Sequence, residues 1–216
     1  MEQKHLLAPG QPRSSELSPD LAALRRAFIP RPGNEAARRG DNDLNFDMAL
    51  PANLRKAAVL VPLVQRPGGM TVLLTRRTDH LPDHPGQISF PGGRIEASDA
   101  SPEAGALREA LEEIGLPAER VEILGRLDIY RTRTGFEITP VVGVVSPPFE
   151  LVPDSHEVAE VFEVPFAFVM DTANHQRHSR EWNGQLRTFY VLPYAHYHIW
   201  GATAGMLVNL AERLRL

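Results

Sequence analysis

Both ends of one helix are marked in this sequence. Ser101 is a suitable N-cap residue, Pro102 fits the first helical position, and Gly115 stands where a left-handed residue commonly ends a helix. Between these ends, apolar residues recur with helical spacing at Leu107, Ala110, Leu111 and Ile114. We therefore predict a helix over residues 102–114 that docks on a sheet through this apolar stripe.

The opposite side of this helix is acidic. Glu109, Glu112 and Glu113 are spaced i, i+3 and i+4, which places their side chains on one helical face. Like charges at these spacings repel, whereas a divalent cation would hold them together, and carboxylate oxygens suit Mg²⁺ or Mn²⁺. Arg108 stands four residues before Glu112 and can orient that carboxylate through a fork contact. Taken alone, the pattern also fits an acidic surface helix.

A pair of glycines precedes the helix. Gly92 and Gly93 follow Phe90-Pro91 and end an apolar, β-like run over residues 87–90. Paired glycines allow positive φ and let the backbone come close to a ligand or a metal. The glycine loop and the acidic helix together predict a ligand site.

Strand-like runs lie on both sides of this helix. Runs over residues 57–64 and 71–75, separated by the turn Pro67-Gly68-Gly69, predict a hairpin. Further strands are expected over residues 121–130, 136–145, 158–162 and 187–192, and further helices over residues 165–170 and 203–214. This order favours an α/β fold, in which helices cover both faces of a mixed sheet in α/β/α layering.

The first 55 residues differ from the remainder. They are punctuated by proline, and only the run from Leu21 to Phe28 looks helical, with Ser18 as N-cap and Pro19 at the first position. We predict that residues 1–55 form a partly helical or flexible arm outside the core. Residues 56–216 are then the principal domain.

Composition narrows the classes of partner and chemistry. With 23 Lys and Arg against 27 Asp and Glu, the net charge of −4 argues against a protein that wraps nucleic acid or binds anionic lipid. The absence of cysteine excludes disulfides, thiolate metal sites and a cysteine nucleophile. Because the chain lacks a membrane-spanning apolar run, we expect a soluble, cytoplasmic protein that acts on a small molecule. The sequence leaves a homodimer open.

The glycine loop and the helix resemble the signature of the Nudix family. In that signature Arg-Glu-apolar-x-Glu-Glu-x-Gly-apolar forms the helical half, which residues 108–116 match throughout. In the loop half, Asp99 stands where the family has Glu, and the gap from Asp99 to Arg108 is one residue longer. The resemblance implies a Nudix-type α/β/α sandwich and a metal-dependent pyrophosphohydrolase. It also implies that Glu109 and Glu113 are metal ligands, that Glu112 assists them, and that Arg108 orients them.

Two further segments are similar to the coenzyme A pyrophosphatase branch of the family. They are the run over residues 73–93, from Leu-Leu-Thr-Arg-Arg to Phe-Pro-Gly-Gly, and the start of the last helix over residues 199–206. This branch shares the longer gap, and it implies cleavage of coenzyme A or acyl-coenzyme A to 3′,5′-ADP and 4′-phosphopantetheine. The substrate-binding residues that it suggests are Arg76, Arg77, Gln87, Gly92 and Gly93.

Two residues depart from the pattern of that branch. Thr78 stands where the branch has Ser or Ala, and Pro82 stands where it has Arg. Pro82 has no side-chain donor for a phosphate, so Arg76 or Arg77 would have to supply that contact.

The family resemblance also suggests a general base, and other functions stay open beside coenzyme A hydrolysis. In this family the base is often a Glu outside the signature, and Glu157 and Glu160 are the candidates, with Glu157 preferred. A hydrolase of ADP-ribose, NADH, a dinucleotide or a dNTP stays open, as does a non-catalytic module that senses a nucleotide. The retention of all three helix carboxylates favours an enzyme.

Overall fold

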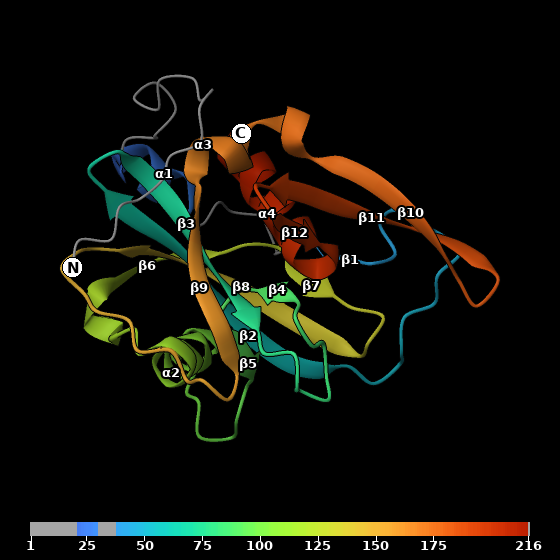
Figure 1. Cartoon of the computed structure of the whole chain (residues 1–216), viewed down its shortest axis with the longest axis horizontal. Coiled ribbons are helices and arrows are strands. Elements are labelled where there is room, and N and C mark those ends of the chain that lie inside the picture. Colours follow the sequence, from blue (N-terminus) through green and yellow to red (C-terminus); the bar gives the residue numbers. More distant parts are fainter. Residues whose placement is uncertain (1–20, 30–37, 216) are drawn as a thin grey trace.

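The computed structural model describes residues 21–29 and 38–215, so the predicted cap at Ser18 and Pro19 lies outside the described residues. Figure 1 shows the arrangement of its elements. The helices are α1 (Leu21–Ala27), α2 (Pro102–Ile114), α3 (Phe166–Met170) and α4 (Gly201–Arg215), and the short 3-10 turns are η1 (Ala118–Arg120) and η2 (Thr172–Asn174). The strands are β1 (Arg38–Gly40), β2 (Arg55–Arg66), β3 (Gly69–Arg77), β4 (Ile88–Ser89), β5 (Gly92–Arg94), β6 (Val121–Arg126), β7 (Ile129–Arg131), β8 (Phe136–Val145), β9 (Val158–Pro165), β10 (Gln176–Trp182), β11 (Gln185–Tyr194) and β12 (Tyr197–Trp200).

The larger sheet is mixed and centred on β2. Its strand order is β1-β7-β8-β2-β3-β4, while β5 pairs with β2, β6 with β8, and β9 with β3. Strand β2 runs parallel to β8 over ten residue pairs and antiparallel to β3. The predicted hairpin is confirmed, because the β2–β3 ladder runs from Leu63–Val72 to Arg66–Gly69. The predicted strand over residues 136–145 coincides with β8, whereas the run over residues 121–130 divides into β6 and β7.

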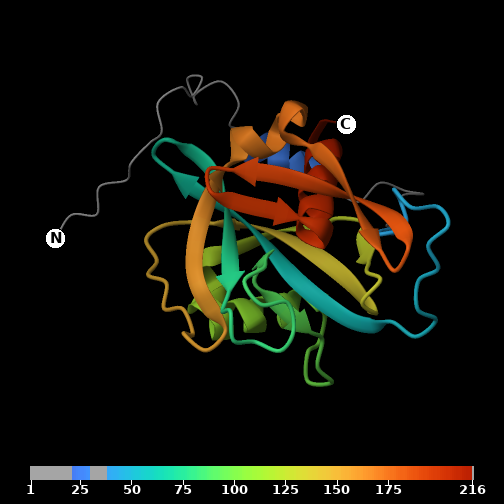
Figure 2. The same ribbon diagram turned by 45° about the vertical axis from the view of Figure 1, so that its right-hand side comes forward.

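Helices cover both faces of this sheet. Successive side chains of a strand point to opposite faces, and β2 is apolar on both. Ala58, Leu60 and Val64 pack with residues of α2, whereas Val61 and Leu63 pack with residues of α4. In Figures 1 and 2, α2 lies on one side of the sheet and α1 and α4 lie on the other. The predicted α/β/α layering is therefore confirmed.

Helix α1 belongs to the core. Leu24 is fully buried and Phe28 is 6% exposed, and both pack in the cluster that contains α4. The interpretation of this segment as an arm outside the core is therefore wrong for α1. Leu21 and Ala27 also pack against this cluster, but in a helix of seven residues such a short apolar pattern does not show from sequence whether the face is buried. The division of the chain at residue 55 stays a prediction.

A smaller sheet consists of β10, β11 and β12, all antiparallel. Strand β11 includes the predicted run over residues 187–192, while β10 was not predicted. This sheet packs on α4 through Leu192 and Ile199, and the β10–β11 hairpin extends away from the body of the molecule in Figures 1 and 2. Within the described residues, no helix is long and apolar enough to cross a membrane.

Candidate active site

Helix α2 begins and ends at the predicted residues. The Ser101 hydroxyl accepts a hydrogen bond from the N–H of Ala104 at 3.2 Å, and Pro102 is the first helical residue. Gly115 has φ of 67° and closes the helix: its N–H donates to the carbonyl of Leu111 at 2.9 Å, and the N–H of Leu116 donates to the carbonyl of Ala110 at 3.2 Å. These two ends hold the acidic segment next to the glycine loop.

The predicted apolar stripe of α2 is partly wrong. Ala110 and Ile114 are fully buried, but Leu111 is 52% exposed, and Ala106 and Glu113 lie on the buried side instead. The small side chain of Ala106 lets α2 approach β2 closely along this face. Apolar side chains favoured the face with Leu111, but Ala106, Ala110, Glu113 and Ile114 also lie on one helical face, and contact with the sheet selected that face.

The three helix carboxylates lie in different environments. Glu113 is buried, with 6% exposure, and accepts a hydrogen bond from the N–H of Gly92 at 3.2 Å. The side chain of Glu109 is 18% exposed, and that of Glu112 is 58% exposed. The expectation that all three turn outward as one patch is therefore wrong for Glu113, which points back toward the glycine loop.

The electrostatics of the two less exposed acids differ from those of a surface helix. Burial is the main cause that raises the pKa of Glu113 to about 8; the charges of Glu109 and Glu157 act in the same direction, and the hydrogen bond from Gly92 opposes them. Burial also raises the pKa of Glu109, while Arg108 lowers it. Both carboxylates are therefore harder to ionise than one on a solvated helix, and a nearby positive charge would favour their ionised form.

Arg108 is the centre of a polar network at this site. Its Nε and Nη2 donate to the two carboxylate oxygens of Asp99, both at 3.1 Å. Its Nη1 donates to Glu109 at 3.1 Å and to Glu112 at 3.0 Å, and Nη2 also donates to the carbonyl of Arg94. The guanidinium thus joins the loop to the helix and fixes the position of Glu109.

Asp99 positions the Arg108 guanidinium, a contact that the sequence analysis did not predict. Its side chain is 5% exposed, and Arg108 lowers its pKa through the paired hydrogen bonds. Its Oδ2 also accepts from the N–H of Glu96, and Gly105 leaves room for it, since a Cβ at Gly105 would lie 3.0 Å from that oxygen. A nine-residue separation across a loop has no helical or strand periodicity, so only the fold brings Asp99 and Arg108 together.

The glycine pair meets a steric requirement at both positions. Gly92 has φ of 155°, and a Cβ there would overlap the backbone of Ala58 and Val59 in the adjacent strand β2. A Cβ at Gly93 would overlap the carboxylate of Glu109. The loop therefore lies against both the sheet and the acidic helix, as the sequence predicted.

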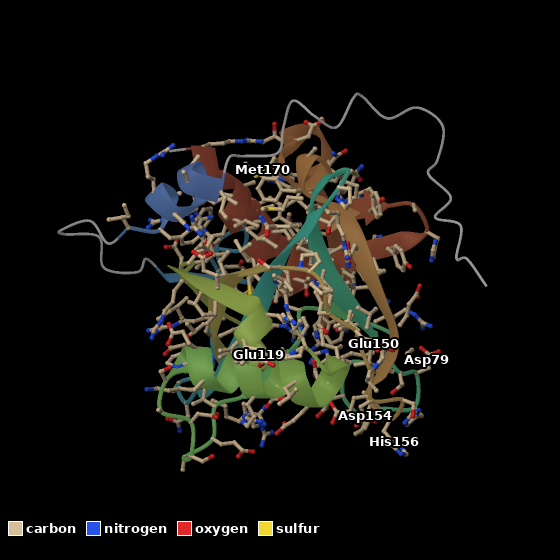
Figure 3. All side chains as sticks on the ribbon, turned by 90° about the vertical axis from the view of Figure 1, so that its left-hand side faces the viewer. Asp79, Glu119, Glu150, Asp154, His156 and Met170 are labelled. Carbon is tan, nitrogen blue, oxygen red and sulfur yellow. The ribbon has the colours of Figure 1, made fainter. Side chains whose placement is uncertain are left out.

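The segment before β9 brings Glu157 to the site. The N–H groups of Val152 and Asp154 donate to the carbonyls of Ile114 and Glu113 at the end of α2, each at 2.9 Å. Thr78 donates its N–H to the carbonyl of Glu157 and its hydroxyl to the carbonyl of His156. In Figure 3, Asp79, Asp154 and His156 lie near one another beside β9. These bonds tie the segment to α2 and to the end of β3.

Glu157 and Glu160, the two candidate bases, face different surroundings. The exposed carboxylate of Glu157 raises the pKa of both Glu109 and Glu113 and therefore lies close to them. Glu160 accepts a hydrogen bond from the hydroxyl of Tyr197 at 2.6 Å and pairs with Arg76 at 3.5 Å. Of this pair, Glu157 is the one whose charge acts on Glu109 and Glu113.

The two predicted arginines also differ. Arg76 pairs with Glu160 and with Asp79, at 3.5 and 3.7 Å. Arg77 contributes positive charge that lowers the pKa of Glu113, and its buried Nε has no hydrogen-bond partner. The backbone N–H of Arg77 donates to the carbonyl of Gln87, which holds the loop over residues 78–87 against β3. The exposed Pro82 lies in that loop.

The donor set fits a divalent metal ion with oxygen ligands. Among residues 21–29 and 38–215, no three His, Asp or Glu side chains converge into a preformed cluster. However, Glu109 and Glu113 flank the glycine loop with raised pKa values, and Glu157 adds a third negative charge nearby. A hard cation would offset this repulsion, so the residues fit Mg²⁺ or Mn²⁺. Glu112 lies on the exposed side of α2, paired with Arg108.

Comparison with known proteins gives a family and close relatives. Residues 54–183 match the model of the NUDIX domain. An uncharacterized Nudix hydrolase NudL of Enterobacter sp. strain 638 is 44% identical over 164 residues, covering 75% of this chain and 84% of that protein. The NudL of Citrobacter koseri, also uncharacterized, is 42% identical with the same coverage.

Two solved structures are also similar. The NUDIX domain of Shewanella oneidensis NrtR complexed with ADP ribose has a TM-score of 0.47 and 21% identity, covering 81% of this chain and 97% of that chain. The Nudix hydrolase RenU of M. smegmatis has a TM-score of 0.42 and 29% identity, covering 53% of this chain and 72% of that chain.

Proposed function

Since this chain belongs to the Nudix family and is a hydrolase of pyrophosphate bonds, we propose that its substrate is coenzyme A or acyl-coenzyme A. The products are then 3′,5′-ADP and 4′-phosphopantetheine. The sequence similarity to the coenzyme A branch over residues 73–93 and 199–206 supports this substrate. The longer gap between Asp99 and Arg108 supports it as well. In this proposal residues 56–216 form the Nudix domain.

The observation that best supports metal-dependent chemistry is the burial of the Glu113 carboxylate, which accepts a hydrogen bond from the Gly92 N–H. Glu109 and Glu113 would hold Mg²⁺ or Mn²⁺, and Glu112 would assist from the exposed side of α2. A bound divalent cation supplies neutralisation of the charge that develops on the pyrophosphate oxygens. Arg108 keeps Glu109 directed toward the loop through its contacts with Glu109 and Asp99.

Glu157 is the proposed general base. Its carboxylate oxygen would accept the proton of the water that attacks phosphorus, since it lies close to Glu109 and Glu113 and is open to solvent. Glu160 is a poorer candidate because Tyr197 and Arg76 occupy its carboxylate.

Arg77 is the proposed phosphate contact, in place of the arginine that Pro82 replaces. Its guanidinium lies near Glu113, and its buried Nε has no partner, whereas Arg76 is paired with two acids. We expect Arg77→Ala to raise KM for the diphosphate substrate about tenfold or more, because a charge-assisted hydrogen bond is lost. Arg76→Ala is the matched control and should change KM less. Equal effects of the two changes on KM would contradict this assignment.

The substrate is tested by incubation of the purified chain with Mg²⁺ or Mn²⁺ and a panel of compounds. The panel contains coenzyme A, acyl-coenzyme A, ADP-ribose, NADH and dNTPs, and products are identified by mass. We expect the highest kcat/KM for coenzyme A or its acyl form. Rapid cleavage of another diphosphate with coenzyme A intact would refute the substrate. Binding of a nucleotide without any hydrolysis would instead indicate a sensing module.

A further inference from the structure

Strand β10 is a seven-residue edge strand that carries charged side chains but has neither a proline nor a bulge to block pairing. All seven of its residues are exposed, and it contains no proline and no glycine. Its pairing with β11 is continuous from Gln176–Val191 to Trp182–Gln185, without a bulge. Within the described part of the chain, β11 is its only strand partner. Such an edge is a template for pairing with another strand.

The hydrogen-bonding direction of β10 follows from its neighbour. Asn45 accepts from the N–H of Thr188 and donates to its carbonyl, both at 2.9 Å, so the backbone of Thr188 points away from β10. Ser179, which is opposite Thr188, therefore occupies a position without backbone hydrogen bonds to β11. The hydroxyls of Ser179 and Thr188 lie 2.9 Å apart, as expected at such a position.

The outward backbone groups therefore belong to alternate residues. In an antiparallel ladder, bonded and unbonded positions alternate, so Arg177, Ser179 and Glu181 direct their N–H and C=O groups to the free edge. His178 and Arg180 direct theirs to β11. The tight Asn183-Gly184 turn at the end of the hairpin, with φ of 50° and 73°, fits this assignment.

We propose that two copies of this chain associate through β10, antiparallel about a two-fold axis at Ser179. In this register Ser179 pairs with Ser179 of the second copy, and Arg177 pairs with Glu181 of the second copy. The two-fold axis repeats the pair of opposite charges, so one seven-residue strand supplies two ion pairs to the interface. Arg177, Ser179 and Glu181 of each copy direct their backbone groups to the partner strand, so these groups can hydrogen-bond across the interface. The two three-stranded sheets then form one continuous six-stranded sheet.

The same register suits the residues between them. Gln176 stands opposite Trp182 of the second copy, and Trp182 is 49% exposed in the single chain. His178 stands opposite Arg180 of the second copy, so the pairing brings no two fixed like charges face to face. A shift by two residues would remove both Arg177–Glu181 pairs, which makes the two-fold register at Ser179 the favoured one.

Charge exchange tests the interface. Sedimentation or light scattering of the full chain between about 1 and 100 µM should show a species of twice 24.0 kDa. Arg177→Glu and Glu181→Arg should each raise the dissociation constant about tenfold or more, because each places like charges opposite one another twice. The double variant should restore the wild-type dissociation constant. Glu119→Arg, on η1 outside this sheet, is the matched control and should have no effect.

A second measurement does not depend on the variants. Amide exchange in the wild-type chain should slow with increasing concentration at Arg177, Ser179 and Glu181, whereas His178 and Arg180 should stay protected at all concentrations. A monomeric wild-type chain at the highest concentration would overturn the proposal. An unchanged dissociation constant in both single variants would also overturn it. So would amide exchange rates at Arg177, Ser179 and Glu181 that do not change with protein concentration.

Discussion

The buried Glu113 predicts a specific pH dependence of stability in the metal-free protein. Its folded-state pKa of about 8 lies above its ordinary value of 4.5. Between these two pH values the folded chain holds one proton more than the unfolded chain, so the free energy of unfolding falls as pH rises. The slope is about 1.4 kcal/mol per pH unit, which gives a loss of about 2 kcal/mol between pH 6 and pH 8. For a chain of this size, that corresponds to a decrease in Tm of about 4–8 °C.

The assay is thermal or urea unfolding in a chelator, comparing the wild-type chain with Glu113→Gln. The variant keeps the size of the side chain but cannot ionise at this position. Its free energy of unfolding should therefore fall about 2 kcal/mol less than that of the wild-type chain between pH 6 and pH 8. Glu119→Gln, at an exposed position, is the control and should keep the wild-type slope. Parallel slopes for wild type and Glu113→Gln would refute the reasoning.

Addition of metal extends this test. Because Mg²⁺ binds the ionised carboxylate, it should stabilise the wild-type chain more at pH 8 than at pH 6, and it should stabilise Glu113→Gln little. The same variant should lose most of its Mg²⁺-dependent turnover while it keeps its fold. Full turnover in Glu113→Gln would rule out this residue as a metal ligand.

Three other changes test the remaining parts of the site. Asp99→Asn removes the negative charge that pairs with the Arg108 guanidinium, so activity or apparent metal affinity should fall about 10- to 100-fold in a Mg²⁺ titration of turnover. An unchanged titration curve would exclude the positioning role of Asp99. Glu157→Gln should reduce kcat about 10²- to 10⁴-fold, whereas Glu160→Gln should leave kcat within a few fold, and the reverse order would exchange their roles. Gly93→Ala should reduce turnover because its methyl group would overlap a carboxylate on α2, while Gly68→Ala, which has free space, should not; equal turnover would place the loop elsewhere.

Local sequence patterns predicted those helices and strands whose formation depends on residues close together in the chain. Ser101 and Gly115 marked both ends of α2, because caps and positive φ are requirements of a few adjacent residues. Apolar runs predicted β2, β3, β8 and β9 of the large sheet in the same way, whereas β1 and β5 were not predicted and the single run over residues 121–130 divides into β6 and β7. The Asn183-Gly184 dipeptide is typical of a hairpin turn, but β10 is polar except for Trp182 and has no apolar alternation.

Tertiary structure alone decided which groups meet at the site. The spacing of α2 allowed Glu113 or Leu111 to face the sheet, and packing of Ala106 and Ala110 against β2 placed Glu113 inside. Proximity of Asp99 to Arg108 depends on contacts between segments, which have no periodicity in the sequence. The residues of the acidic helix were thus evident from the chain itself. Their division into a buried acid, a partly buried acid and an exposed acid is a consequence of the sheet beneath them.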